Sequence, residues 1–133
     1  MVEITFTESD IKDKSYLEEQ IELEAQRLYT SPKARKGRSI EEIRESVRRG
    51  KVAEVWLIEN YSFKTAPDIY HDLIDRDGNY VEVKAYNVYS SNAPHVQNDL
   101  YRIRTGGWNR SKWYLLFQHN KGVYKFLEKI SIR

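Results

Sequence analysis

Cysteine is absent from the chain, which has 133 residues. A protein without cysteine has neither disulfides nor thiolate ligands, so zinc sites of the finger type are excluded. The sequence also lacks an N-terminal signal pattern and any apolar run near the roughly twenty residues that span a membrane. Together these absences predict a cytoplasmic protein of a reducing compartment, with no membrane partner.

Several familiar catalytic motifs are missing as well. The sequence has no glycine-rich phosphate loop, no serine nucleophile elbow and no internal repeat. Its three histidines, His71, His95 and His119, lack a recognised ligand spacing, which favours incidental positions. These absences argue against a phosphate-loop enzyme, a serine hydrolase and a histidine metal centre.

The length and the 40% hydrophobic content suit one domain over residues 1–133, with a modest core. Charge is unevenly placed along it. Residues 1–30 hold eight acids and three bases, whereas residues 31–133 hold twelve acids and nineteen bases. We therefore expect an acidic arm and helix over 1–30, a candidate dimerisation element, and a basic catalytic core over 39–133.

Residues 72–84, DLIDRDGNYVEVK, have the pattern of a β-hairpin. Arg-Asp-Gly at 76–78 suits a three-residue loop in which the glycine takes the left-handed conformation and forms a bulge. Counting back along both strands from this loop places Asp72 opposite Glu82, and opposed residues share a face. Lys84 points to the same face because side chains alternate along a strand. Two acids and one lysine are thus predicted to converge.

The intervening residues Val81, Val83 and Ala85 point to the other face, where they can enter a core. Divalent cations such as Mg²⁺ prefer carboxylate oxygens, usually one or two from the protein, with waters and substrate phosphates completing the shell. Asp72 and Glu82 are candidates for that pair. A nearby lysine can orient a water and offset charge on a phosphate. The combination predicts metal-assisted phosphodiester hydrolysis.

A rival acid and a simpler explanation compete with this prediction. Asp68 follows Pro67, but four residues of extended strand place it roughly 13 Å from Asp72, too far to share an ion with Glu82. Because 32% of the residues are charged, a Glu-x-Lys triplet is also expected about once by chance, as an ordinary solvated pair. The matched position of Asp72, the apolar opposite face and the glycine turn favour the functional interpretation.

The hairpin segment resembles the active-site signature of the PD-(D/E)xK nuclease superfamily. The matching residues are Asp72 and, after nine intervening residues, Glu82-Val83-Lys84. That superfamily includes many type II restriction endonucleases and the archaeal-type Holliday junction resolvases. With Asp75 and Gly78 included, the pattern looks closest to small restriction endonucleases of the PvuII kind. The resemblance is local, from about residue 72 to residue 117.

The resemblance implies an endonuclease that hydrolyses DNA to 5′-phosphate and 3′-hydroxyl ends with Mg²⁺. Asp72 and Glu82 would bind the ion, the Val83 carbonyl would be a further ligand, and Lys84 would assist the attacking water. Hard oxygen ligands also accept Mn²⁺. Site-specific cleavage of both strands needs two such centres, which implies a homodimer. The chain departs from the family in having His71 before Asp72 and in its base-reading segment, so no target sequence carries over.

A further acid, Glu54, is a catalytic candidate. The segment that ends there, RRGKVAE, resembles the helix of resolvases and several relatives that lends an acid to the metal site. The competing explanation is a surface ion pair with Lys51 on the same helix.

Candidate DNA contacts fall in two segments. The basic segment 30–38 is expected to be an exposed loop that contacts phosphates or is merely solvated. The amides after the hairpin can pair with adenine edges, and the arginines with guanine or phosphate, although each could equally be a plain surface residue. The candidates are Lys33, Arg35, Lys36, Arg38, Asn92, Gln97, Asn98, Arg102 and Arg104.

The expected fold is α/β of the restriction-endonuclease-like kind: a mixed central sheet that carries the catalytic hairpin and is flanked by helices. The expected elements are a strand or arm at 2–7, helices at 9–29, 39–49 and 95–103, strands at 112–118 and 123–127, and a turn at 119–122. Ser39 and Glu42 form a capping box, and Gly50 either ends or bends the helix that follows. The acidic helix is expected to pack on the domain, to meet a second subunit, or to lie in solvent.

Two other functions remain open. A Holliday junction resolvase, or another structure-specific nuclease, would share the catalytic residues on double-stranded or branched DNA but need no base readers. A non-catalytic DNA-binding module would keep the hairpin only as structure, and its binding would be indifferent to Mg²⁺.

Overall fold

A computed structural model of the protein describes residues 3–68, 71–107 and 109–133. The elements in chain order are β1 (Thr5–Thr7), a 3-10 helix η1 (Glu8–Asp10), α1 (Lys14–Tyr29), α2 (Pro32–Arg35), α3 (Ile40–Tyr61), β2 (Lys64–Thr65), β3 (Leu73–Ile74), β4 (Tyr80–Tyr86), α4 (Pro94–Thr105), β5 (Trp113–Asn120) and β6 (Val123–Ser131). Among these residues, no helix is both long and apolar enough to cross a membrane.

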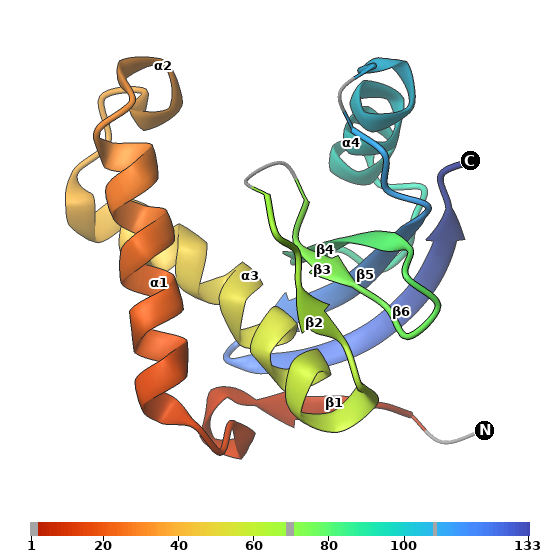
Figure 1. Cartoon of the computed structure of the whole chain (residues 1–133), viewed down its shortest axis with the longest axis horizontal. Helices are drawn as coiled ribbons and strands as arrows, with labels where there is room; N and C mark the ends of the chain where they lie inside the picture. The colour runs from red at the N-terminus through yellow and green to blue at the C-terminus, as the bar shows by residue number, and fades with distance from the viewer. Residues whose placement is uncertain (1–2, 69–70, 108) are drawn as a thin grey trace.

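The strands form one mixed, curled sheet in the order β1-β6-β5-β4-β3-β2 (Figure 1). β4 and β5 are parallel, and every other neighbouring pair is antiparallel. A parallel pair needs a long crossover, which α4 supplies between the two strands. The predicted α/β class and mixed central sheet are confirmed.

Helices cover both faces of the sheet. α1 and α3 lie on one face with Val81 and Val83 of β4, and α4 lies on the other with Val96 and Leu100. β5 contributes to both cores by alternation, with Leu115 and Phe117 facing α1 and α3, and Tyr114 and Leu116 facing α4. This explains why the strand is apolar throughout.

The hairpin has the predicted register. Leu73 pairs with Val81 and Ile74 with Tyr80, so the pairing extrapolates to Asp72 opposite Glu82. The loop closes as expected: the Asp75 N–H donates to the Asn79 carbonyl at 2.9 Å, and Gly78 has a φ of +83°. β3 is only two residues long, so Asp72 lies just before the strand rather than in it.

The helix predicted from the capping box is longer than expected. The Ser39 side chain accepts from the Glu42 N–H at 3.2 Å, and the Glu42 carboxylate accepts from the Ser39 N–H at 3.0 Å. α3 neither ends nor restarts at Gly50 but runs on to Tyr61. Buried residues at helical spacing beyond the glycine, Val52 and Val55 among them, keep one face against the core and outweigh the poor helix propensity of glycine.

The acidic helix α1 begins later than predicted and packs within the chain. Its cap is Asp13, whose carboxylate accepts from the Tyr16 N–H at 3.0 Å, whereas residues 8–10 form the short 3-10 turn. Arginines of α3 neutralise its acids: Arg44 contacts Glu22 at 2.9 Å, and Arg48 contacts Glu18 at 2.7 Å. Of the three environments expected for this helix, packing on the domain is therefore observed.

The basic segment 30–38 is not a simple loop. It contains the four-residue helix α2, followed by Lys36 with a φ of +54°. The Arg35 guanidinium lies 4.0 Å from the Tyr29 ring centroid, and Arg38 donates to the Ala34 carbonyl at 2.8 Å. Two of the four basic residues in this segment thus make contacts within the segment or with the end of α1.

The C-terminal strands also extend beyond their predicted limits. β5 continues through His119 to Asn120, which pairs with Val123, so the turn is Lys121-Gly122 alone, both with positive φ. β6 runs on to Ser131. The two-residue turn matches the twist of the strands, which allows pairing up to its edge.

The packing of α1 gives a direct test. We expect Ile21→Ala, which truncates a side chain that is 1% exposed, to lower the free energy of unfolding by about 2–5 kcal/mol in urea denaturation. The matched control is Leu23→Ala on the same helix, where the side chain is 61% exposed and the change should stay within about 0.5 kcal/mol. Equal losses for the two variants would contradict the packing.

Candidate active site

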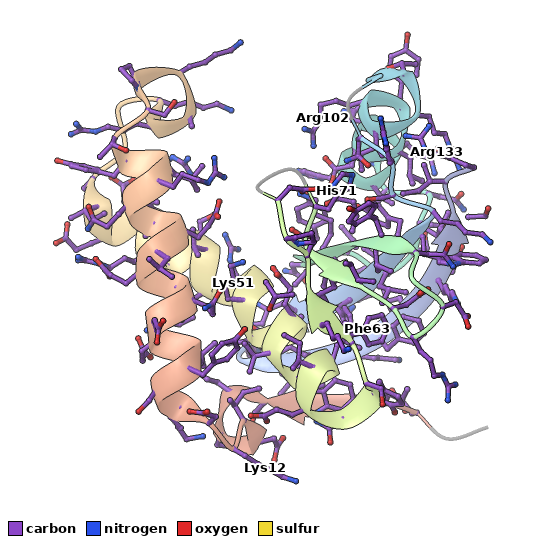
Figure 2. All side chains as sticks on the ribbon, viewed as in Figure 1. Lys12, Lys51, Phe63, His71, Arg102 and Arg133 are labelled. Carbon is purple, nitrogen blue, oxygen red and sulfur yellow. The ribbon has the colours of Figure 1, made fainter. Side chains whose placement is uncertain are left out.

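A cavity of about 790 Å³ is lined by residues of α1, α3, the hairpin and α4. Lys51 of α3, His71 at the hairpin and Arg102 of α4 mark three of its walls (Figure 2). All the predicted catalytic residues line it: Glu54, Asp72, Glu82 and Lys84, together with Val83. The structure therefore brings to one cavity residues that are up to 30 positions apart in the sequence.

Asp72 and Glu82 are close neighbours. The Val83 N–H donates to Asp72 Oδ2 at 2.8 Å, which holds the Asp72 carboxylate against β4. The Asp72 and Glu82 carboxyl groups lie within hydrogen-bonding contact of each other. Burial and the neighbouring charge of Asp72 raise the pKa of Glu82 to about 8, against the opposing effect of Lys84. Negative charge on this pair is thus poorly compensated by the protein.

Glu54 enters the same cavity from α3. Its side chain is buried, and burial followed by repulsion from Asp72 raises its pKa to about 8. The Lys51 ammonium lies 3.2 Å from Glu54 Oε1, so the ion pair expected between them exists. It is nevertheless not a surface pair, because the two side chains are only 17% and 10% exposed. With Asp72 and Glu82, Glu54 is the third carboxylate of this site.

Lys84 faces these carboxylates from β4. Burial disfavours its ammonium, but the surrounding charges, chiefly that of Asp72, outweigh this and raise its pKa. Among the described residues no hydrogen bond or ion pair holds its Nζ. The ammonium thus lies in a negative environment and has donors left for a substrate or a water.

A small network on α4 lies behind Lys84. Asp99 accepts hydrogen bonds from the Tyr86 hydroxyl and, at 3.0 Å, from the Tyr114 hydroxyl, while its other oxygen accepts from Arg102 at 3.1 Å. Sequence reasoning did not single out Asp99, which contacts Arg102, or the two tyrosines that donate to Asp99. They connect α4 to the strand that carries Lys84.

The donor set fits a hard divalent cation. The buried Glu82 carboxyl group lies next to the half-buried Asp72 carboxyl group, so a cation can bind to oxygens of both. Within the described ranges, no group of three or more His, Cys, Asp or Glu side chains is arranged to hold a metal ion. Asp72 and Glu82 would therefore need oxygens from the Val83 carbonyl, water or a substrate phosphate, which is how Mg²⁺ is commonly bound.

The predicted DNA-contact residues are dispersed. Of these, Arg102 lines the cavity. Arg104 instead donates to the carbonyls of Ser131 and Ile132, which ties α4 to the end of β6. The exposed members elsewhere are Lys33 and Lys36 at α2, and Asn92, Gln97 and Asn98 at the start of α4, where the Gln97 amide donates to the Ser91 carbonyl at 2.6 Å.

His71 is not an incidental histidine. Its ring is stacked on Tyr80 with centroids 4.0 Å apart, and its Nδ1 lies 2.9 Å from Asp68 Oδ1. Its Nε2 accepts from the Arg110 N–H at 2.9 Å, which assigns the ring proton to Nδ1. This contact also folds Asp68 back towards His71, so the extended-strand distance assumed between Asp68 and Asp72 does not apply. Asp68 lines the cavity as well.

Asn109 is a candidate site residue that sequence reasoning missed. It is 2% exposed, and its Nδ2 donates to Glu82 Oε1 at 2.9 Å. The two residues are 27 positions apart. No periodicity or motif signals such a contact, which depends on how the loop before β5 folds over β4.

Comparisons of the chain with protein-family models, with curated proteins and with solved structures found no match. Any functional conclusion therefore depends on the geometry of the site itself.

The buried acids predict how stability varies with pH in the metal-free protein. The folded-state pKa of Glu54 is raised from 4.5 to about 8. The stability that Glu54 contributes to the folded protein is therefore fully present below about pH 4.5 and is lost as the pH rises through about 8. Glu54→Gln removes this loss. Its melting temperature should exceed that of the wild type by several degrees at about pH 9 and by little at about pH 5.

The matched control for that experiment is Glu45→Gln, which alters an exposed acid on the same helix. Thermal denaturation in EDTA should show no pH-dependent gain for this variant. A gain for Glu54→Gln that is equal at both pH values would contradict the assigned environment.

Proposed function

We propose that the chain is a Mg²⁺-dependent DNA endonuclease with a restriction-endonuclease-like fold of the PD-(D/E)xK kind. The observation that carries this proposal is the contact of the Asp72 and Glu82 carboxyl groups on a hairpin whose next same-face residue is Lys84. Paired acids with a lysine are suited to hydrolysing a phosphodiester. The mixed sheet, with the hairpin near one end and helices on both faces, is compatible with that fold.

In this mechanism Asp72, Glu82 and the Val83 carbonyl would hold Mg²⁺, and the ion would supply Lewis-acid chemistry for the phosphate and the attacking water. Lys84 donates a hydrogen bond to that water or to a phosphate oxygen and offsets the negative charge that develops there. Glu54 accepts a proton or a hydrogen bond from the water shell on the α3 side. The products are a 5′-phosphate and a 3′-hydroxyl.

The walls of the cavity offer positive charge to the DNA backbone. Arg49 and Lys51 line it from α3 and Arg102 from α4, so phosphates would be contacted on both sides of the carboxylates. α2 and α4 lie at the upper left and upper right of Figure 1, and the exposed Lys33 of α2 and Lys36, its C-terminal cap, extend the basic surface on the α2 side. Exposed amides at the start of α4 are the proposed base readers.

Removal of Lys84 tests the proposed chemistry. We expect wild-type protein to cut plasmid DNA only with Mg²⁺ or Mn²⁺, and Lys84→Ala to lower the cleavage rate about 10²- to 10³-fold, because it removes one stabilising donor from the transition state. Lys129→Ala, at an exposed position of β6, is the control and should cut at the wild-type rate. Equal cleavage by wild type and Lys84→Ala would remove this residue from the mechanism.

A second candidate is a Holliday junction resolvase, which the burial of Glu54 beside Asp72 favours. Incubation with four-way junctions and with linear plasmid fragments separates the two. We expect discrete, sequence-dependent fragments from linear DNA, produced by a homodimer whose two centres cut the two strands. Preferential cleavage of the junction would favour the resolvase, and Mg²⁺-independent binding without cleavage would contradict both.

A further inference from the structure

The loop between α4 and β5 contacts the side chain of Glu82, one of the proposed metal ligands. Asn109 uses both ends of its amide: Nδ2 donates to Glu82 Oε1 at 2.9 Å, and Oδ1 accepts from the Ser111 N–H at 2.8 Å. Asn109 is 2% exposed and Glu82 7%. A buried hydrogen bond to a carboxylate is stronger than one between neutral groups, so this contact restricts the side chain of Glu82.

The loop is itself anchored to its surroundings. The Arg133 guanidinium donates to the Asn109 carbonyl and, at 3.2 Å, to the Ser111 carbonyl. The Arg110 N–H donates to Nε2 of His71, the residue immediately before Asp72. One short loop therefore contacts both arms of the hairpin, next to each of the two carboxylates.

These contacts leave a defined set of oxygens. The Val83 N–H engages Asp72 Oδ2, and Asn109 engages Glu82 Oε1. In the part of the chain that the structure describes, Asp72 Oδ1 and Glu82 Oε2 accept no hydrogen bond from a backbone N–H or a side-chain amide. Each of the two carboxylates has one oxygen hydrogen-bonded to the protein. Such carboxylates lose less conformational freedom when a cation binds than carboxylates that rotate freely.

We propose that Asn109 is a positioning residue, whose amide holds the Glu82 carboxylate so that its second oxygen is available to the cation. The inference rests on the proposed function, because it assigns Asn109 a role in the same metal site. A purely structural amide that holds only the loop through Ser111 is the competing explanation. Metal affinity distinguishes the two roles, because loop stability alone does not set it.

The experiment measures Mn²⁺ binding by isothermal titration calorimetry in the absence of DNA, with Mg²⁺-dependent plasmid cleavage as a second readout. Asn109→Ala should raise the Kd for Mn²⁺ about 10- to 100-fold. It should also raise the Mg²⁺ concentration needed for half-maximal cleavage, while excess Mg²⁺ restores most of the rate. Loss of a merely structural contact would not be restored by excess Mg²⁺.

Two further variants serve as controls. Ser111→Ala removes a buried hydroxyl that has no hydrogen-bond partner among the described residues, so it changes the same loop without touching Glu82 and should leave the Kd unchanged. Arg133→Ala, at an exposed position, loosens the loop but keeps the Asn109 amide, and should weaken Mn²⁺ binding by a smaller factor. Should Asn109→Ala fail to fold, wild-type affinity in Arg133→Ala would count against the inference.

The outcomes separate the two proposals. Wild-type Mn²⁺ affinity in Asn109→Ala, with binding abolished in Glu82→Gln, would overturn the positioning role and leave the proposed function standing. An absence of Mn²⁺ binding and of cleavage in the wild type would overturn both.

Discussion

The contact between the carboxyl groups of the half-buried Asp72 and the buried Glu82 is the constraint on which the rest of the site depends. Bringing like charges together in a desolvated position raises the pKa of Glu82 to about 8, so the folded protein tolerates the pair at a cost in stability. Sites that retain such an arrangement commonly use it for chemistry. The hairpin register that creates the contact follows from one glycine turn and the alternation of apolar residues.

The surrounding fold explains how the pair is held in place. β4 packs Val81 and Val83 into the core beneath α1 and α3, which fixes the strand that carries Glu82 and Lys84. The short β3 leaves Asp72 at the edge of the cavity, and the uninterrupted α3 brings Glu54 to it from another layer. Local strand geometry thus determines the positions of Asp72 and Glu82, whereas tertiary packing brings in the third acid, Glu54.

Sequence reasoning succeeded where the determinants are local. Turn chemistry predicted the hairpin register, and the Ser39 capping box predicted the start of α3, because a few adjacent residues decide each of them. It was less reliable where alternatives compete: α1 begins after the Asp13 cap rather than at residue 9, and a continuing apolar face overrides Gly50. The contacts of Asn109 and His71 could not be predicted, since they depend on long-range folding of loops with no sequence pattern.

Crystals soaked with Mn²⁺ would test the central claim most directly, because anomalous scattering locates the ion without reference to activity. The account predicts an anomalous peak between the Asp72 and Glu82 carboxylates, on the side of β4 that Lys84 shares. It would be contradicted by a peak at another group of residues, or by none at a Mn²⁺ concentration that supports DNA cleavage.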